Sequence, residues 1–263
     1  MLNFLKTKKG ILSYFKKTSD ENKKFKRYIE LVEKNMYSED DALKANHLIS
    51  VIVEHLNFKE AMEALESYLV NQKNPLIEEI YYALESELFL DKHTIIVDKM
   101  SEKDKKCYQS DEDTEILDEE PINVEINQIP ILLNPWNGQR VINNLVCINE
   151  NNIFDGKEYK FNIQNYYLYP MNIVVCNGGN HSQFSARMKN QGNTIIKELH
   201  DYSNIYSLIE FDGENYIKSK DKTVIELNYD KEIVFYSGVI FELGRYNLKD
   251  STYILDTIKE KIK

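Results

Sequence analysis

Hydrophobic residues recur at helical spacing over the first third of the chain. Between residues 21 and 92 the apolar positions follow the three-to-four-residue period of an amphipathic helix. Patterns typical of helix starts fall in this region: Ser38 with Asp41, Asn57 with Glu60, and Pro75 after Asn74. The connections are short, so we predict an antiparallel bundle of about four helices before Lys92.

After Pro121 the pattern becomes that of strands broken by turns. Asp212-Gly213 lies between two β-prone runs in residues 208–217, which predicts a hairpin. The other predicted strands are 122–126, 129–133, 173–176 and 233–236, with another apolar run at 239–243, and the predicted helices are 137–147 and 247–263.

A strongly acidic stretch separates these two parts. Between residues 101 and 120 apolar side chains are few, so the stretch buries too little surface to order itself. We expect a surface linker there, with a metal-binding or partner-docking acidic loop as the alternative. The predicted fold class is α+β: a helical domain over 1–100 with a basic N-terminal arm, an acidic linker over 101–120, and a small mixed α/β domain over 121–263.

One segment has the local pattern of an anion-binding site. A buried strand is predicted at 173–176, and Gly178 and Gly179 then permit positive φ and close backbone approach. The helix expected from about Ser182 would turn its unpaired N–H groups toward this turn, where a phosphate fits. Arg187 lies in the last helical turn, and Gly192 is placed as the C-terminal cap.

The composition is that of a soluble globular protein. Hydrophobic residues make up 42% of the chain and charged residues 29%, so disorder is not indicated. No apolar run approaches the roughly 20 residues of a spanning helix, and no secretory signal is recognisable, so we expect a cytoplasmic location. The cysteines (Cys107, Cys147, Cys176) lack CxxC spacing and the histidines lack ligand-like spacing. We therefore expect free thiols and no metal site.

The charge distribution bears on the choice of partners. A net charge of −10 repels polyanions and disfavours a broad nucleic-acid surface. Residues 1–28 nevertheless hold nine Lys and Arg against two acidic residues. Such a basic arm suits nucleic acid or an anionic membrane, and a solvated terminus is the simpler interpretation.

Two motifs resemble the ParB/sulfiredoxin-like fold, a small α/β domain that binds phosphate groups at a glycine-rich turn opening a helix. Residues 129–137 are similar to its opening strand and proline break, and 177–187 to its phosphate motif. The chain also resembles an uncharacterised bacterial family with Pro-Trp-Asn, Asn-His and Phe-Glu-Leu-Gly-Arg segments. It carries Asn180 where sulfiredoxins have the reactive cysteine, so thiol-based sulfinic reduction is not expected. It carries Ser182 where an arginine follows the turn in ParB-like proteins and sulfiredoxins, so the bidentate phosphate pairing of that arginine is lost.

The turn and the resemblance together define candidate site residues. His181 and Asn180 are the candidate catalytic residues, because a histidine titrates near neutrality and lies here beside a helix N-terminus. A structural hydrogen bond that fixes the turn is the alternative for His181. Trp136 would stack on a base or pack in the core, and Arg245 would join the site or pair with Glu242. The candidate ligand-binding residues are Asn177, Gly178, Gly179, Ser182, Arg187, Trp136, Arg140 and Arg245.

The leading hypothesis is a protein that binds a phosphate-bearing ligand, with a nucleotide as the expected ligand. The residues leave open whether the ligand is turned over by phosphoryl transfer or hydrolysis, and Mg²⁺ is the expected cofactor in that case. One alternative is a non-catalytic interaction module of a bacterial defence or DNA-maintenance system, docking a protein partner through the helical half. Another is a ParB-like nuclease, which the acidic balance disfavours.

Overall fold

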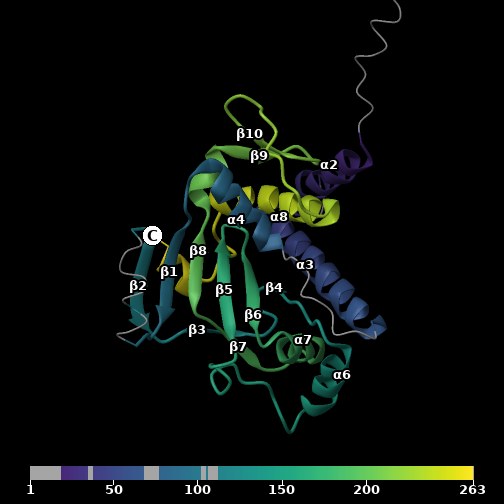
Figure 1. Cartoon of the computed structure of the whole chain (residues 1–263), viewed down its shortest axis with the longest axis vertical. Helices are drawn as coiled ribbons and strands as arrows, with labels where there is room; N and C mark the ends of the chain where they lie inside the picture. Colours follow the sequence, from purple (N-terminus) through teal and green to yellow (C-terminus); the bar gives the residue numbers. More distant parts are fainter. Residues whose placement is uncertain (1–18, 35–37, 68–76, 102–104, 106–111, 263) are drawn as a thin grey trace, which may run out of the picture.

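The computed structural model describes residues 19–34, 38–67, 77–101, 105 and 112–262. Helices pack on a mixed sheet and at one end of it (Figure 1), which confirms the α+β class. The basic arm before residue 19, the predicted helix start at Pro75 and Cys107 lie outside the described residues. No helix of the described ranges is long and apolar enough to cross a membrane.

The N-terminal region is helical, as predicted. Its described helices are α2 (Asp20–Glu33), α3 (Asp41–Glu66) and α4 (Ile77–Leu88). All three pack against α8 (Lys231–Lys249), so a helix from the C-terminal end of the chain completes the bundle. Asp40 caps α3 by accepting from the Leu43 N–H, two residues after the predicted cap Ser38.

The strand predicted at 233–236 is wrong, because this run and the apolar run at 239–243 both lie inside α8. Asp230 starts this helix by accepting from the N–H groups of Glu232 and Ile233. The helix packs against α2, α3, α4 and β9 (Ile209–Phe211), so its apolar residues are not confined to one stripe. A short apolar run does not by itself distinguish a strand from a buried helix.

The central sheet has six strands in the order β2-β1-β8-β5-β6-β4 (Figure 1). The pairs β1–β2, β5–β8 and β4–β6 are parallel, and β1–β8 and β5–β6 are antiparallel. Their bounds are β1 (His93–Asp98), β2 (Thr114–Glu119), β4 (Ile131–Leu132), β5 (Gln164–Tyr169), β6 (Ile173–Gly178) and β8 (Glu198–Asp201).

Two small sheets and two short helices complete the fold. β3 (Ile122–Glu125) pairs antiparallel with β7 (Asn193–Ile196), and β9 pairs with β10 (Tyr216–Lys218) in the predicted hairpin. The short helices are η1 (Ser203–Ser207) and α9 (Asp256–Lys259), so the terminal helix predicted over 247–263 is limited to the end of α8 and to α9.

Strand β2 corrects the expectation that residues 101–120 form only a surface linker. It lies at the edge of the sheet and pairs in parallel with β1, whose centre is buried. Lysines neutralise the acidic side chains: Lys105 donates to Asp118 at 2.9 Å and Lys99 to Glu120 at 2.7 Å. Backbone pairing to a buried neighbour therefore orders a stretch whose own side chains bury little.

Different parts of the chain cover the two faces of the sheet. Tyr166, Leu168 and Val175 lie in one apolar cluster with residues of α3, α4 and α8. Tyr167 and Val174 point to the opposite face and cluster with residues of β3, β7 and α7 (Asn180–Lys189). The first cluster joins the N-terminal helices to the sheet, so the core runs across the boundary predicted at residue 100.

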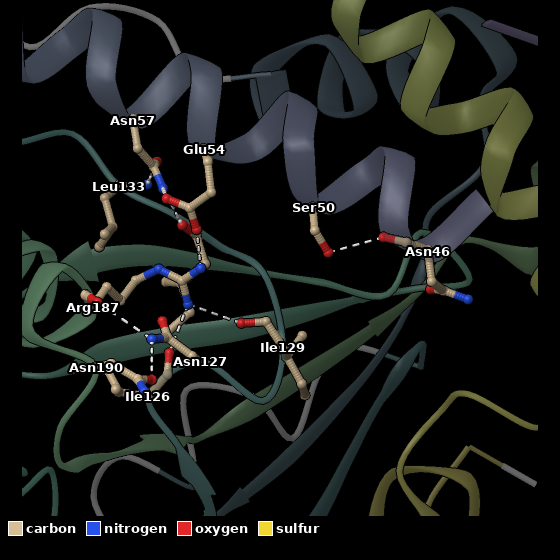
Figure 2. A network of polar contacts seen from close by, with 11 residues as sticks. Asn46, Ser50, Glu54, Asn57, Ile126, Asn127, Ile129, Leu133, Arg187 and Asn190 are labelled. Carbon is tan, nitrogen blue, oxygen red and sulfur yellow. Dashed lines mark hydrogen bonds and ion pairs between the residues drawn. The ribbon is translucent and has the colours of Figure 1, made fainter. Parts of the chain in front are cut away.

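Asn57, which was predicted to start a helix, instead lies buried in the middle of α3 (Figure 2). Its carboxamide donates to the Ile131 carbonyl at 2.8 Å and accepts from the Leu133 N–H at 2.8 Å. These two bonds satisfy backbone groups of β4 and of the residue that follows it. Asn57 therefore fixes the short strand that leads into the segment bearing Trp136.

Arg187 makes a second connection to α3, one helical turn away from Asn57 (Figure 2). Its guanidinium donates to the carbonyls of Ile126 at 2.6 Å and Ile129 at 3.1 Å, and it pairs with Glu54. Only 9% of the Arg187 side chain is exposed. The arginine thus ties the end of α7 to α3 and to the connection between β3 and β4.

We expect Asn57→Ala to lower the free energy of unfolding by about 2–4 kcal/mol, because it leaves a buried N–H and a buried carbonyl without partners. Urea denaturation with an unchanged m-value would measure this loss. Met62→Ala, at an exposed position of the same helix, should change the stability by less than about 0.5 kcal/mol. A loss below about 1 kcal/mol for Asn57→Ala would contradict its role in fixing β4.

Candidate functional site

Hydrogen bonds to the Gly178 carbonyl fix the turn that follows β6. The Gly178 oxygen accepts from Gln183 Nε2 at 3.1 Å and from the thiol of Cys176 at 2.9 Å. Gln183 and Cys176 are both fully buried. The Gly178 carbonyl therefore points into the protein, with two donors fixing its direction.

This orientation directs the following amide outward. In a trans peptide the carbonyl and the next N–H point in opposite directions, so the Gly179 N–H faces away from Gln183 and Cys176. Gly179 has φ +82° and is the N-cap of α7, without a side-chain cap. The first N–H groups of α7 consequently keep their donor capacity.

The two glycines serve the different purposes that the sequence suggested. Gly179 adopts positive φ, whereas a Cβ on Gly178 would lie 2.4 Å from the Asn162 carbonyl oxygen. The helix starts at Asn180, two residues before the predicted start. It ends at Asn190 in the left-handed conformation, which asparagine tolerates, and not at the predicted cap Gly192.

The first turn of α7 also anchors the segment that carries Trp136. Asn180 Oδ1 accepts from the Asn134 N–H at 2.7 Å, and His181 Nε2 accepts from the Asn137 N–H at 3.1 Å. Asn137 in turn caps α6 (Gly138–Cys147), a helix the sequence predicted. The two candidate catalytic side chains therefore make structural hydrogen bonds, the alternative given for His181, and a catalytic role for them stays a prediction.

His181 is held in its neutral form. Burial, and secondarily the nearby positive charge of Arg140, lowers the pKa of its imidazole to about 4. Because Nε2 accepts from Asn137, the neutral ring carries its hydrogen on Nδ1. At pH 7 His181 is thus a hydrogen-bond donor through Nδ1 and a poor general acid.

A pocket of about 560 Å³ opens between α6 and the first turn of α7. No carboxylate of the described residues lines it, although the chain has a net charge of −10. Three other pockets formed by described residues each contain glutamates, for example Glu60, Glu21 and Glu79. The pocket is lined by Trp136, Arg140, Asn143, Asn144, Asn162, Asn177, Gly178, Gly179, Asn180, His181 and Ser182.

Arg140 supplies the positive charge of the pocket. Its guanidinium carbon lies 5.2 Å from the centre of the Trp136 ring, which in turn contacts His181 edge-on at 5.2 Å. Arg140 has no carboxylate partner among the described residues, and it is exposed. A cation–π contact thus positions a guanidinium that remains available to an anion.

The structure brings most of the predicted site residues together, and it places two elsewhere. Arg187 is engaged by Glu54 and by backbone carbonyls, as described above. Arg245 pairs with Glu242 at 2.6 Å and donates to two backbone carbonyls, which is the ion pair given as its alternative. Neither arginine lines the pocket, so both are corrected as ligand residues.

Several residues that shape the pocket were not predicted from the sequence. Asn144 accepts from the Ser182 hydroxyl at 3.0 Å and so joins α6 to α7. It lies four residues after Arg140 on α6, and this helical spacing is the pattern that would have identified it. Gln183 and Asn162 have no local pattern, because their role depends on where the turn lies in space.

Within the described ranges, no group of three His, Cys, Asp or Glu residues is placed to hold a metal ion. Cys147 and Cys176 are free thiols, as expected. Cys176 acts through its hydrogen bond to Gly178.

We expect Gly178→Ala to destabilise the protein more than Gly179→Asn. The alanine Cβ would overlap the Asn162 carbonyl, and overpacking of this kind costs about 1–3 kcal/mol. Asparagine tolerates the left-handed conformation of residue 179, where the nearest atom to a Cβ is 3.4 Å away. Thermal or urea denaturation of both variants gives the order, and the reverse order would refute this assignment of the two glycines.

The lowered pKa of His181 predicts a pH-dependent contribution to stability. Between pH 6.5 and about 4 the unfolded chain takes up a proton on this ring that the folded protein excludes. Wild type should therefore lose up to about 3 kcal/mol relative to His181→Gln as the pH falls through this window, with no such change above pH 6.5. Urea denaturation of both proteins at pH 7, 5.5 and 4 measures the difference, and parallel profiles would show that the imidazole is not desolvated.

A family model described as a family of unknown function, DUF6710, matches residues 11–253. No curated protein and no solved structure was found to match the chain. The family match extends over most of the sequence, and the chain therefore belongs to the DUF6710 family of unknown function.

Proposed function

We propose that the protein binds a phosphate-bearing ligand, with a nucleotide as the ligand class, in the pocket between α6 and α7. The observation that carries the proposal is the Gly178 carbonyl, which is hydrogen-bonded inward and so turns the Gly179 N–H outward. The same turn carries the resemblance to the phosphate motif of ParB/sulfiredoxin-like domains. A relation to that fold is part of the proposal.

The residues that line the pocket supply three kinds of donor for a phosphate. The N–H groups of Gly179 and of the first residues of α7 offer backbone donors at the positive end of a helix dipole. Arg140 offers a charged guanidinium, which forms paired hydrogen bonds with phosphate oxygens. His181 offers the N–H of Nδ1. None of the described residues that line the pocket is a carboxylate, so no lining side chain repels an anion by its charge.

The properties of the His181 imidazole support a role in ligand binding and not in acid–base catalysis. With a pKa of about 4 the ring does not supply a proton to a leaving group at pH 7. Its Nε2 lone pair is already used by the Asn137 N–H. We therefore assign His181 to ligand binding and assign no step of phosphoryl transfer or hydrolysis.

Isothermal titration with ATP, ADP, CTP and GTP, each with and without Mg²⁺, tests the proposal. We expect at least one of these nucleotides to bind the wild-type protein. Arg140→Ala should weaken that binding by about 10- to 100-fold, because hydrogen bonds to a charged group contribute about 1.5–3 kcal/mol. Arg27→Ala removes the same charge from the exposed surface of α2 and serves as the matched control, with unchanged affinity.

Two results would overturn the proposed function. One is the absence of binding by all four nucleotides under both conditions. The other is an equal loss of affinity in Arg140→Ala and Arg27→Ala, which would mean that only the overall charge of the protein matters.

A further inference from the structure

A second pocket adjoins the proposed phosphate site. It has a volume of about 210 Å³ and lies between the end of α6 and residues 152–163. Its walls are mainly carbon, contributed by Ile148, Ile153, Phe154, Tyr159 and Ile163. As in the first pocket, none of the lining residues in the described part of the chain is a carboxylate.

The two pockets share part of their walls. Asn144, Asn162, Gly179 and Ser182 line both of them. The hydrogen bond from Ser182 to Asn144 lies on this shared wall and fixes it at the contact between α6 and α7. One small molecule can therefore occupy both pockets, with its anionic group at Gly179 and its remainder against the apolar walls.

The second pocket is suited to a planar ring. Phe154 and Tyr159 stack with their planes 7° apart and their centroids 6.0 Å apart, and Tyr159 is 42% exposed. A cavity of about 150 Å³ with apolar walls accommodates benzene, so this volume has room for an aromatic ring. Aromatic side chains stack on the ring of any nucleobase.

Polar groups at the shared wall favour a nucleobase over an acyl chain. The Asn162 carboxamide makes no hydrogen bond with any described residue, and it lines both pockets. A carboxamide offers one acceptor and two donors, which match the edge of a heterocyclic base and find no partner on a hydrocarbon chain.

We infer that the ligand is a mononucleotide, whose base enters the pocket of Phe154 and Tyr159 while its phosphate lies at Gly179 and Arg140. This inference rests on the proposed function, since it takes the phosphate site as given. It adds that the base contributes to affinity and that a bare phosphate or a sugar phosphate binds more weakly.

The test compares ribose 5-phosphate with AMP and CMP by isothermal titration of the full chain. Wild type should bind at least one of the nucleotides about fivefold to a hundredfold more tightly than ribose 5-phosphate, the range expected for one stacked base. Tyr159→Ala should remove this advantage and leave the affinity for ribose 5-phosphate unchanged. Tyr159→Phe keeps the ring and should retain the advantage.

Phe161→Ala is the matched control, because Phe161 is an aromatic residue two positions away that is 85% exposed and lines neither pocket. It should bind every ligand as the wild type does. Both exposed positions tolerate alanine, and a thermal melt of each variant verifies the fold.

The outcomes separate the two proposals. If ribose 5-phosphate and the nucleotides bind equally well, or if Tyr159→Ala weakens all of them equally, the base pocket is refuted and the phosphate site stands. If no phosphate-bearing ligand binds while the variants remain folded, the proposed function fails and this inference fails with it.

Discussion

The hydrogen bonds that hold the Gly178 carbonyl inside the protein determine which way the turn at the end of β6 faces. If this peptide were flipped, the buried Gln183 amide and the buried Cys176 thiol would each lose one acceptor, and a net hydrogen bond contributes about 0.5–1.5 kcal/mol. The carbonyl oxygen would then point into the pocket and repel an anion. The native orientation of this one peptide thus gives the buried donors of Gln183 and Cys176 an acceptor, and it also turns the Gly179 N–H toward the pocket.

A buried amide network makes this orientation rigid. Asn165 and Gln183 exchange hydrogen bonds through their carboxamides at 3.0 and 3.1 Å, and the Thr194 hydroxyl donates to Gln183 at 2.6 Å. Because all three residues are almost completely buried, their partners are fixed and water does not compete. The donors at the turn are therefore preorganised, which lowers the entropy lost on ligand binding.

The sequence predicted those parts of the site that depend on neighbours along the chain. The strand, the glycine turn and the following helix are local, and Asn137 was adjacent to the helix it caps. Arg187 lay beyond such reasoning, because its partner Glu54 is 133 positions away and the choice between a ligand and a carboxylate is made by the fold. The strand prediction within α8 was wrong for a related reason. Because α8 is contacted on several sides, its apolar residues do not follow a clear helical period.

The position of α3 explains why the helical half and the site are parts of one unit. Glu54 holds α7 through Arg187, and Asn57 holds β4, from which the Trp136 segment continues. The two residues are three positions apart and lie on the same face of α3, so both walls of the pocket are attached to the same turn of one helix. A displacement of α3 would carry both walls in the same direction, which preserves the spacing between Arg140 and the Gly179 amide. The two walls are also joined to each other directly, through the hydrogen bonds of Asn134 with Asn180, of Asn137 with His181 and of Ser182 with Asn144.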